Sequence, residues 1–221
     1  MKKARKNATI KETNELKVVS EFPKEEKMPR ISKEPKALKR DIMEATIKVF
    51  NDKGLKFTMD DIAKECHISK KTLYLIFNDK DELFLTMVDY IFDAIKESEE
   101  KVLEDPSLST VEKIRKIIGV MPDGYKDIDF RQLYLLRDKY PATYAQVEER
   151  LETGWETTIA LIEQGIKEGV IRKVPVPIIK MMVEASLEQF FQRDILIKSK
   201  ISYNEALAEV VNIIVDGITV K

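Results

Sequence analysis

The sequence contains very little cysteine, histidine or glycine. Cysteine and histidine each occur once in the 221 residues, as Cys66 and His67. One cysteine allows no intramolecular disulfide, and the two residues are too few for a His/Cys zinc site within one chain. We therefore expect no metal and a reducing, cytoplasmic location. The 7 glycines are about half the usual frequency, whereas turn-rich β architectures need more. The composition favours an all-α fold.

Long apolar runs and catalytic patterns are also missing. Nowhere do eighteen apolar residues follow one another, so we expect no membrane span. The N-terminal residues 1–17 are basic without an apolar core, which argues against a secretory signal. The chain shows no nucleophile–base pair, glycine-rich phosphate loop or metal-ligand spacing, so we do not expect an enzyme.

The charge is unevenly distributed along the chain. Residues 1–78 carry 19 basic and 12 acidic side chains, whereas residues 79–221 carry 19 basic and 27 acidic ones. The formal net charge of -1 therefore averages a positive N-terminal part and a negative remainder. This asymmetry indicates a module that binds a polyanion, joined to a body that does not contact it.

Residues 1–35 form a separate basic extension with ten Lys/Arg, six Glu and three prolines but no sustained periodicity. We interpret it as a flexible, solvated tail. Two alternatives are a basic arm that follows DNA phosphates or enters a minor groove, and a segment pinned to the body by Val18, Val19 and Phe22.

The next residues predict three helices in close succession. Apolar residues spaced three or four apart predict a first helix of about 17 residues from Lys36, which Gly54 ends. Thr58 and Asp61 have the spacing of a capping box for a short helix that runs to about Cys66. Ser69 then caps a third helix of two turns. Two short helices joined by a tight turn and braced by a longer one are typical of a helix-turn-helix unit.

The third helix has one apolar and one polar face. Leu73 and Phe77 are expected to point into the core. The other face is short, cationic and rich in hydroxyl groups, which can bond phosphates and base edges in a major groove. We expect it to consist of Ser69, Lys70, Lys71, Thr72 and Tyr74.

Across this region the sequence resembles the tetracycline-repressor (TetR) family of transcriptional regulators. The resemblance rests on about 50 contiguous residues, which include Ile42–Ala45, Phe50, Gly54, Thr58–Ala63, Ile68–Tyr74, Phe77 and Lys80–Leu83. It implies that Thr58, Tyr74 and Lys80 contact phosphates. It also implies that Lys70, Lys71 and Thr72 lie where bases or their flanking phosphates are contacted.

Three positions depart from the family pattern. His67 occupies a turn position where relatives often have glycine; histidine can adopt the left-handed conformation there, at a cost that glycine avoids. Leu75 and Ile76 replace residues that are often Arg and His, which removes two polar DNA contacts. The operator sequence of a relative is therefore not transferable.

The periodicity beyond Asn78 predicts an entirely helical body. We expect a long fourth helix to about Leu103, then helices near 109–120, 129–138, 141–168, 176–198 and 202–218. This divides the chain into an extension (1–35), a helix-turn-helix DNA-binding domain (36–82) and a ligand-binding and dimerisation domain (83–221).

Large, flexible and aromatic side chains in the body suggest an effector cavity rather than a cofactor site. We expect a non-covalent small molecule of apolar or amphipathic character. The residues we expect to line its cavity are Met87, Ile91, Ile95, Met121, Phe130, Tyr134, Trp155, Ile159 and Met181.

The last two helices carry more apolar surface than one core requires. Such helices form four-helix interfaces in homodimers, and the resemblance implies the same use. The expected interface residues are Ile179, Phe190, Phe191, Leu207, Val210, Val211 and Ile214. The leading hypothesis is a homodimeric repressor that binds a palindromic operator and is released by an effector. The alternatives are an adaptor that acts through a protein partner and a constitutive DNA binder.

Overall fold

Helices make up nearly all of the regular structure. The computed structural model describes residues 34–125, 131–192 and 195–221. Its first elements are α1 (Pro35–Lys53), the 3-10 turn η1 (Gly54–Lys56), α2 (Met59–Glu65), α3 (Lys70–Tyr74) and α4 (Lys80–Glu104). They are followed by α5 (Thr110–Ile118), η2 (Asp123–Tyr125), α6 (Arg131–Lys139), α7 (Pro141–Glu152), α8 (Glu156–Glu168), α9 (Val176–Gln192), α10 (Ile195–Ser199) and α11 (Tyr203–Ile218). The expected all-α fold is confirmed over this part of the chain.

The described ranges cover the residues needed to assess a membrane span but not those of the N-terminal extension. No helix within the described ranges is long and apolar enough to cross a membrane. The predictions for the extension concern residues 1–33, which lie outside these ranges, and the predicted domain boundaries stay predictions.

The first three helices begin and end where the local sequence predicts. Gly54 stands after α1 with a φ of 56°, a left-handed value that glycine adopts without strain. Thr58 and Asp61 form the predicted capping box of α2, and the Ser69 side chain caps α3. His67 also takes a left-handed φ, 54°, in the turn between α2 and α3. Each boundary is therefore set by residues within four positions of it.

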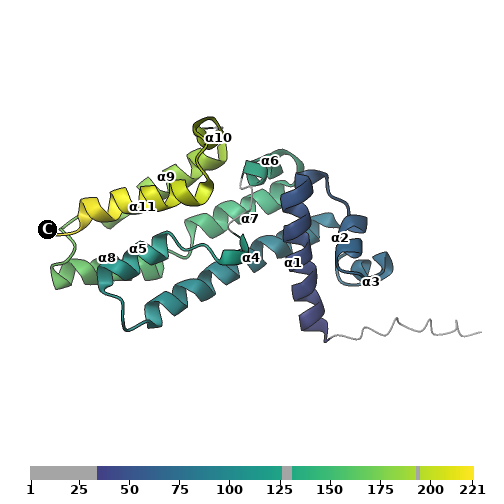
Figure 1. Ribbon diagram of the computed structural model, residues 1–221, viewed down its shortest axis with the longest axis horizontal. Coiled ribbons are helices and arrows are strands. Elements are labelled where there is room, and N and C mark those ends of the chain that lie inside the picture. The colour runs from purple at the N-terminus through teal and green to yellow at the C-terminus, as the bar shows by residue number, and fades with distance from the viewer. Residues whose placement is uncertain (1–33, 126–130, 193–194) are drawn as a thin grey trace, which may run out of the picture. The chain divides into compact units, whose positions relative to one another are not determined.

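One apolar core joins these helices to the first half of α4. It contains fully buried aromatic rings, among them Phe50, Phe57, Phe77 and Phe84. Figure 1 shows α1 crossing α4 near this core, and residues of α6 and α7 also reach it through Leu136 and Val147. The unit formed by the first three helices, the head, is thus packed directly against part of the body.

A second core holds the rest of the body together. Ile114 and Ile117 of α5 pack there with side chains of α8, α9 and α11. Figure 1 shows α11 running beside α9, and the two helices are in contact. The second core therefore brings together helices that are far apart in the sequence.

The single long helix predicted over residues 141–168 is wrong. The chain breaks it between α7 and α8, at residues 153–155. Gly154 has a φ of 79°, outside the helical region, and its carbonyl accepts a 2.6 Å hydrogen bond from Lys96 Nζ. Because Lys96 lies 58 positions earlier on α4, helical periodicity alone does not reveal this break. Within the predicted helix 176–198 the structure describes α9 and α10, and residues 193–194 between them lie outside the described ranges.

The predicted dimer interface needs correction, because several of its members are already buried within one chain. Four of them pack in the second core, with exposed fractions of 2–5%: Ile179, Leu207, Val211 and Ile214. Val210 is half-buried, and Phe190 packs edge-on against Tyr203 with ring centroids 6.0 Å apart. The side chain of Phe191 lies outside the described residues. The opposite faces of α9 and α11 are the exposed ones.

Candidate DNA-binding surface and effector cavity

The candidate DNA-binding surface is built on the short helix α3. Its base is fixed by Leu73 and Phe77, which are 0% and 1% exposed, as predicted. Lys70, Lys71 and Tyr74 are exposed on the other side. The two ammonium groups and the phenol of these residues are therefore exposed on a helix that Leu73 and Phe77 hold against the core. This arrangement suits phosphate and base contacts in a major groove.

Two other predicted contacts on this surface are engaged in capping. Ser69 Oγ accepts a 3.0 Å hydrogen bond from the Thr72 amide and lies 2.8 Å from Thr72 Oγ1. Ser69 remains exposed, whereas Thr72 is only 7% exposed. The prediction that Thr72 faces outward is therefore wrong, because its hydroxyl turns back to the N-terminus of α3.

Thr58 lies at the N-terminus of α2 and is exposed. Its hydroxyl donates to Asp61 Oδ2 at 2.9 Å, and Asp61 also accepts 2.7 Å hydrogen bonds from Lys53 Nζ and 2.8 Å from the Thr58 amide. These bonds favour the carboxylate and lower the pKa of Asp61 to about 2, with Lys53 the largest cause. Thr58 is thus held at the surface in a fixed orientation, where a phosphate contact stays a prediction.

Lys80 occupies a different environment from the one predicted. Its ammonium group donates to the carbonyls of Leu55 and Phe57 at 2.8 and 2.6 Å. It also lies 4.1 Å from the centroid of the Phe57 ring, 5.4 Å from that of Phe84 and 5.6 Å from that of Tyr140. Burial lowers the pKa of Lys80, and the neighbouring Lys139 lowers it further.

These contacts correct the interpretation of Lys80 as a phosphate ligand. In the free chain its charge is directed to the end of η1 and to an aromatic cluster, not to the DNA-binding surface. Because Tyr140 precedes α7, the same ammonium group connects the head to the body.

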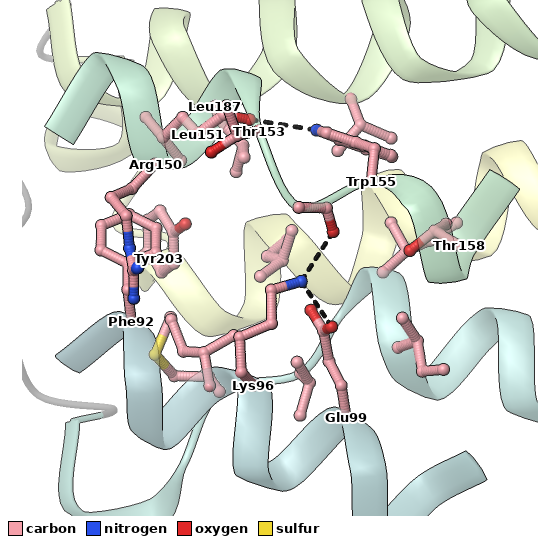
Figure 2. A pocket seen from close by; sticks show the side chains of 18 residues that line it. Phe92, Lys96, Glu99, Arg150, Leu151, Thr153, Trp155, Thr158, Leu187 and Tyr203 are labelled. Atoms are coloured by element: carbon pink, nitrogen blue, oxygen red, sulfur yellow. Dashed lines mark hydrogen bonds and ion pairs between the residues drawn. The ribbon is translucent and has the colours of Figure 1, made fainter. Parts of the chain in front are cut away.

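The body contains a cavity of about 130 Å³ between α4, α5, α7, α8, α9 and α11. Figure 2 shows Phe92, Lys96, Leu151, Trp155 and Tyr203 around it. Most of the lining is aliphatic or aromatic. The main polar side chains already bond to protein groups: Lys96 to Glu99 at 2.7 Å, Arg150 to Asp93 at 2.5 Å, and Trp155 Nε1 to the Leu151 carbonyl at 3.0 Å. The space left is therefore largely apolar.

The sequence predicted this cavity only in part. Ile95, Met121 and Trp155 line it as expected. Met87 and Ile91 instead lie in the first core with 0% and 6% exposure, and Met181 is 56% exposed on α9. Ile159 is half-buried but is not among the lining residues. Phe130 and the side chain of Tyr134 fall outside the described residues. The lining residues that the sequence did not indicate include Phe92, Leu187 and Tyr203.

Together, the three-helix head and the cationic surface of α3 define a helix-turn-helix DNA-binding protein with a helical body. Residues 42–87 match the family model described as bacterial regulatory proteins, tetR family. The HTH-type transcriptional regulator YvaF of Bacillus subtilis is 25% identical over 80% of this chain and 94% of its own length.

Solved structures show the same fold. A TetR transcription regulator from Haloarcula marismortui has a TM-score of 0.64 at 19% identity, over 84% of this chain and all of that chain. The regulator FadR from Bacillus subtilis, solved in complex with stearoyl-CoA, has a TM-score of 0.56 at 18% identity over 81% of this chain and 98% of its own. The N-terminal part of the chain is thus of the tetR type, and over most of its length the chain is similar to transcriptional regulators.

Proposed function

We propose that this regulator binds a palindromic DNA operator as a homodimer in the cytoplasm and represses transcription until a small effector releases it. The observation that carries this proposal is the exposed Lys70, Lys71 and Tyr74 surface on the anchored helix α3. Two such surfaces, about 34 Å apart in a dimer, match successive major grooves on one side of a duplex.

The exposed faces of α9 and α11 support the dimer. Ile178, Met181 and Met182 of α9 are 45%, 56% and 48% exposed, and their spacing places them on one side of the helix. On the neighbouring helix α11, Ile213 is 62% exposed. Exposed apolar side chains gathered on a helix face are typical of protein interfaces, and a second copy would cover them symmetrically.

A charge placed on this face tests the dimer. We expect Met181→Glu to give a particle of the 25.6 kDa chain mass in light scattering, where the native protein gives twice that mass. Loss of the second half-site should weaken binding to a selected palindromic duplex by about 10²–10⁴-fold. Leu135→Glu is the matched control, because Leu135 is 53% exposed on α6. A native protein that is monomeric yet binds the palindrome would contradict the dimer, and enrichment of no duplex at all would favour an adaptor.

The cavity supports effector control because α4 links it to the head. Lys80 begins α4, whereas Phe92, Ile95 and Lys96, further along the same helix, line the cavity. Sixteen residues of helix separate Lys80 from Lys96, about 24 Å. A ligand that tilts α4 at the cavity therefore changes the position of the head, and with it the spacing of the two heads on DNA.

The size and lining of the cavity favour a small, uncharged apolar effector. A dry cavity of about 150 Å³ in another protein accepts benzene, so 130 Å³ has room for about one ring. A charged ligand would have to compete with the existing bonds of Lys96, Glu99 and Arg150. The stearoyl-CoA bound by FadR is far larger, so a ligand of that length would require the cavity to open.

The single tryptophan provides the test, because Trp155 lines the cavity. We expect benzene or toluene to change its fluorescence, with benzoate and benzylamine having little effect at equal concentration. Val183→Phe should abolish the response by filling the cavity, since Val183 is 2% exposed and lines it. Val220→Phe is the control at an exposed valine. A response that survives Val183→Phe would place the ligand elsewhere, and a preference for either charged probe would contradict the proposed chemistry.

A further inference from the structure

Two large apolar side chains of the DNA-binding head are exposed, and they are neighbours. Over residues 34–82, all of which the structure describes, the large hydrophobic side chains at the surface are Tyr74 (45%) and Leu75 (56%). The others in this range are buried or half-buried. A single exposed leucine is ordinary on a protein surface. This one is notable because it lies beside the lysines of α3.

The backbone holds Leu75 in this exposed position. Its amide donates to the Lys71 carbonyl at 3.1 Å and completes the last turn of α3. Leu73 before it and Phe77 after it are buried, and the Ile76 and Phe77 amides both donate to the Leu73 carbonyl at 3.0 Å. With a buried anchor two residues away on each side, the Leu75 side chain does not turn into the core. It is exposed beside Lys70, Lys71 and Tyr74, and a duplex that binds these residues would also meet Leu75.

We propose that Leu75 is a specificity-determining residue that recognises thymine through its C5-methyl group. An aliphatic side chain offers no hydrogen bond to a phosphate or a polar base edge. The thymine methyl is the apolar group that the major groove presents, and side chains without polar atoms contact it. Leu75 therefore adds an apolar contact beside the polar ones of Lys70, Lys71 and Tyr74, so the operator carries an A·T pair where Leu75 meets it. This inference rests on the proposed binding to DNA.

Uracil provides a test, because it lacks only the methyl group of thymine. Duplexes that bind the full-length protein are first selected from a random-sequence library. Each thymine of the half-site is then replaced with deoxyuridine in turn. At one position we expect the replacement to lower the affinity about fourfold per half-site, because that is the loss in binding expected when one methyl group is no longer buried. Replacement in both half-sites should cost about 15-fold.

Variants assign this effect to its residue. Leu75→Ala should bind the thymine duplex more weakly and should no longer distinguish it from the uracil duplex. Leu135→Ala, at the 53% exposed leucine of α6, should keep the full discrimination. Thermal unfolding of both variants checks that they fold.

The outcomes separate this inference from the proposed function. Selection of no duplex would refute DNA binding itself. A selected duplex without any position sensitive to the methyl group, or a sensitivity that persists in Leu75→Ala, would overturn the role of Leu75 and leave DNA binding intact.

Discussion

Lys80→Met should destabilise the folded chain by about 2–4 kcal/mol and leave the salt dependence of DNA affinity unchanged. The variant keeps a long apolar side chain but removes two hydrogen bonds to the carbonyls of Leu55 and Phe57. Each bond from a charged donor contributes about 1.5–3 kcal/mol, and the contact with the Phe57 ring adds about 0.5–2 kcal/mol. The sum is an upper bound, because such contributions are not additive.

The salt series decides between this structural role and a phosphate contact. A lysine that neutralises a phosphate releases counterions, so its loss flattens the slope of log K against log salt by about 0.9 per contact. Lys70→Met provides the comparison, because Lys70 is exposed on α3 and is predicted to meet bases or phosphates. If Lys80→Met flattens the slope as Lys70→Met does, the Lys80 ammonium moves to DNA in the complex and acts as a phosphate ligand there.

The head was predictable from its sequence because its boundaries are local. The Thr58–Asp61 capping box, the Ser69 cap and Gly54 each act within four residues, so the spacing of residue types identifies them. The inward positions of Leu73 and Phe77 followed from helical periodicity alone. The outward position predicted for Thr72 was wrong because α3 has only 5 residues. In so short a helix Thr72 lies in the first turn, and its hydroxyl bonds to the capping residue Ser69.

The body was less predictable because its helices are apolar on more than one side. On α9, Ile179 and Met181 are both apolar, yet one is 2% exposed and the other 56%. Which of them faces the core depends on where α11 packs, and a single sequence does not specify that neighbour. The same ambiguity applies to α4. Met87 and Ile91 were predicted to line the cavity but lie in the first core, and Phe92 lines the cavity instead. Periodicity locates a helix but does not choose between its apolar faces.

The role of Lys80 was missed for a related reason. Its position at the N-terminus of α4 indicated an anion-binding site, whereas the acceptors that it uses lie 25 and 23 residues earlier in the chain. These acceptors are backbone carbonyls, which every residue has, so the sequence does not indicate them. The three aromatic rings around the ammonium group were the available signal, but they come from three separate segments.

Phe84→Ala should cost about 3–5 kcal/mol of stability, the usual range for truncating a fully buried phenylalanine. Phe84 is 0% exposed. Its ring centroid lies 5.9 Å from that of Phe50, 5.2 Å from that of Phe57 and 4.8 Å from that of Tyr140. This one side chain of α4 therefore contacts α1, the residue that follows η1 and the residue that precedes α7. Phe84→Leu, which retains most of the volume, should cost less than about 1.5 kcal/mol.

A double-mutant cycle tests whether this ring couples the head to the body. Phe84→Ala, Tyr140→Ala and the double variant are compared by denaturant unfolding, with an expected coupling energy of about 0.5–1.5 kcal/mol between the two rings. Phe84 paired with Ile213→Ala is the control, because Ile213 is exposed on α11 and packs in neither core. Additive losses for Phe84 and Tyr140 would mean that the rings are merely adjacent. Coupling confined to that pair would identify an aromatic contact through which the α6–α7 corner of the body constrains the head.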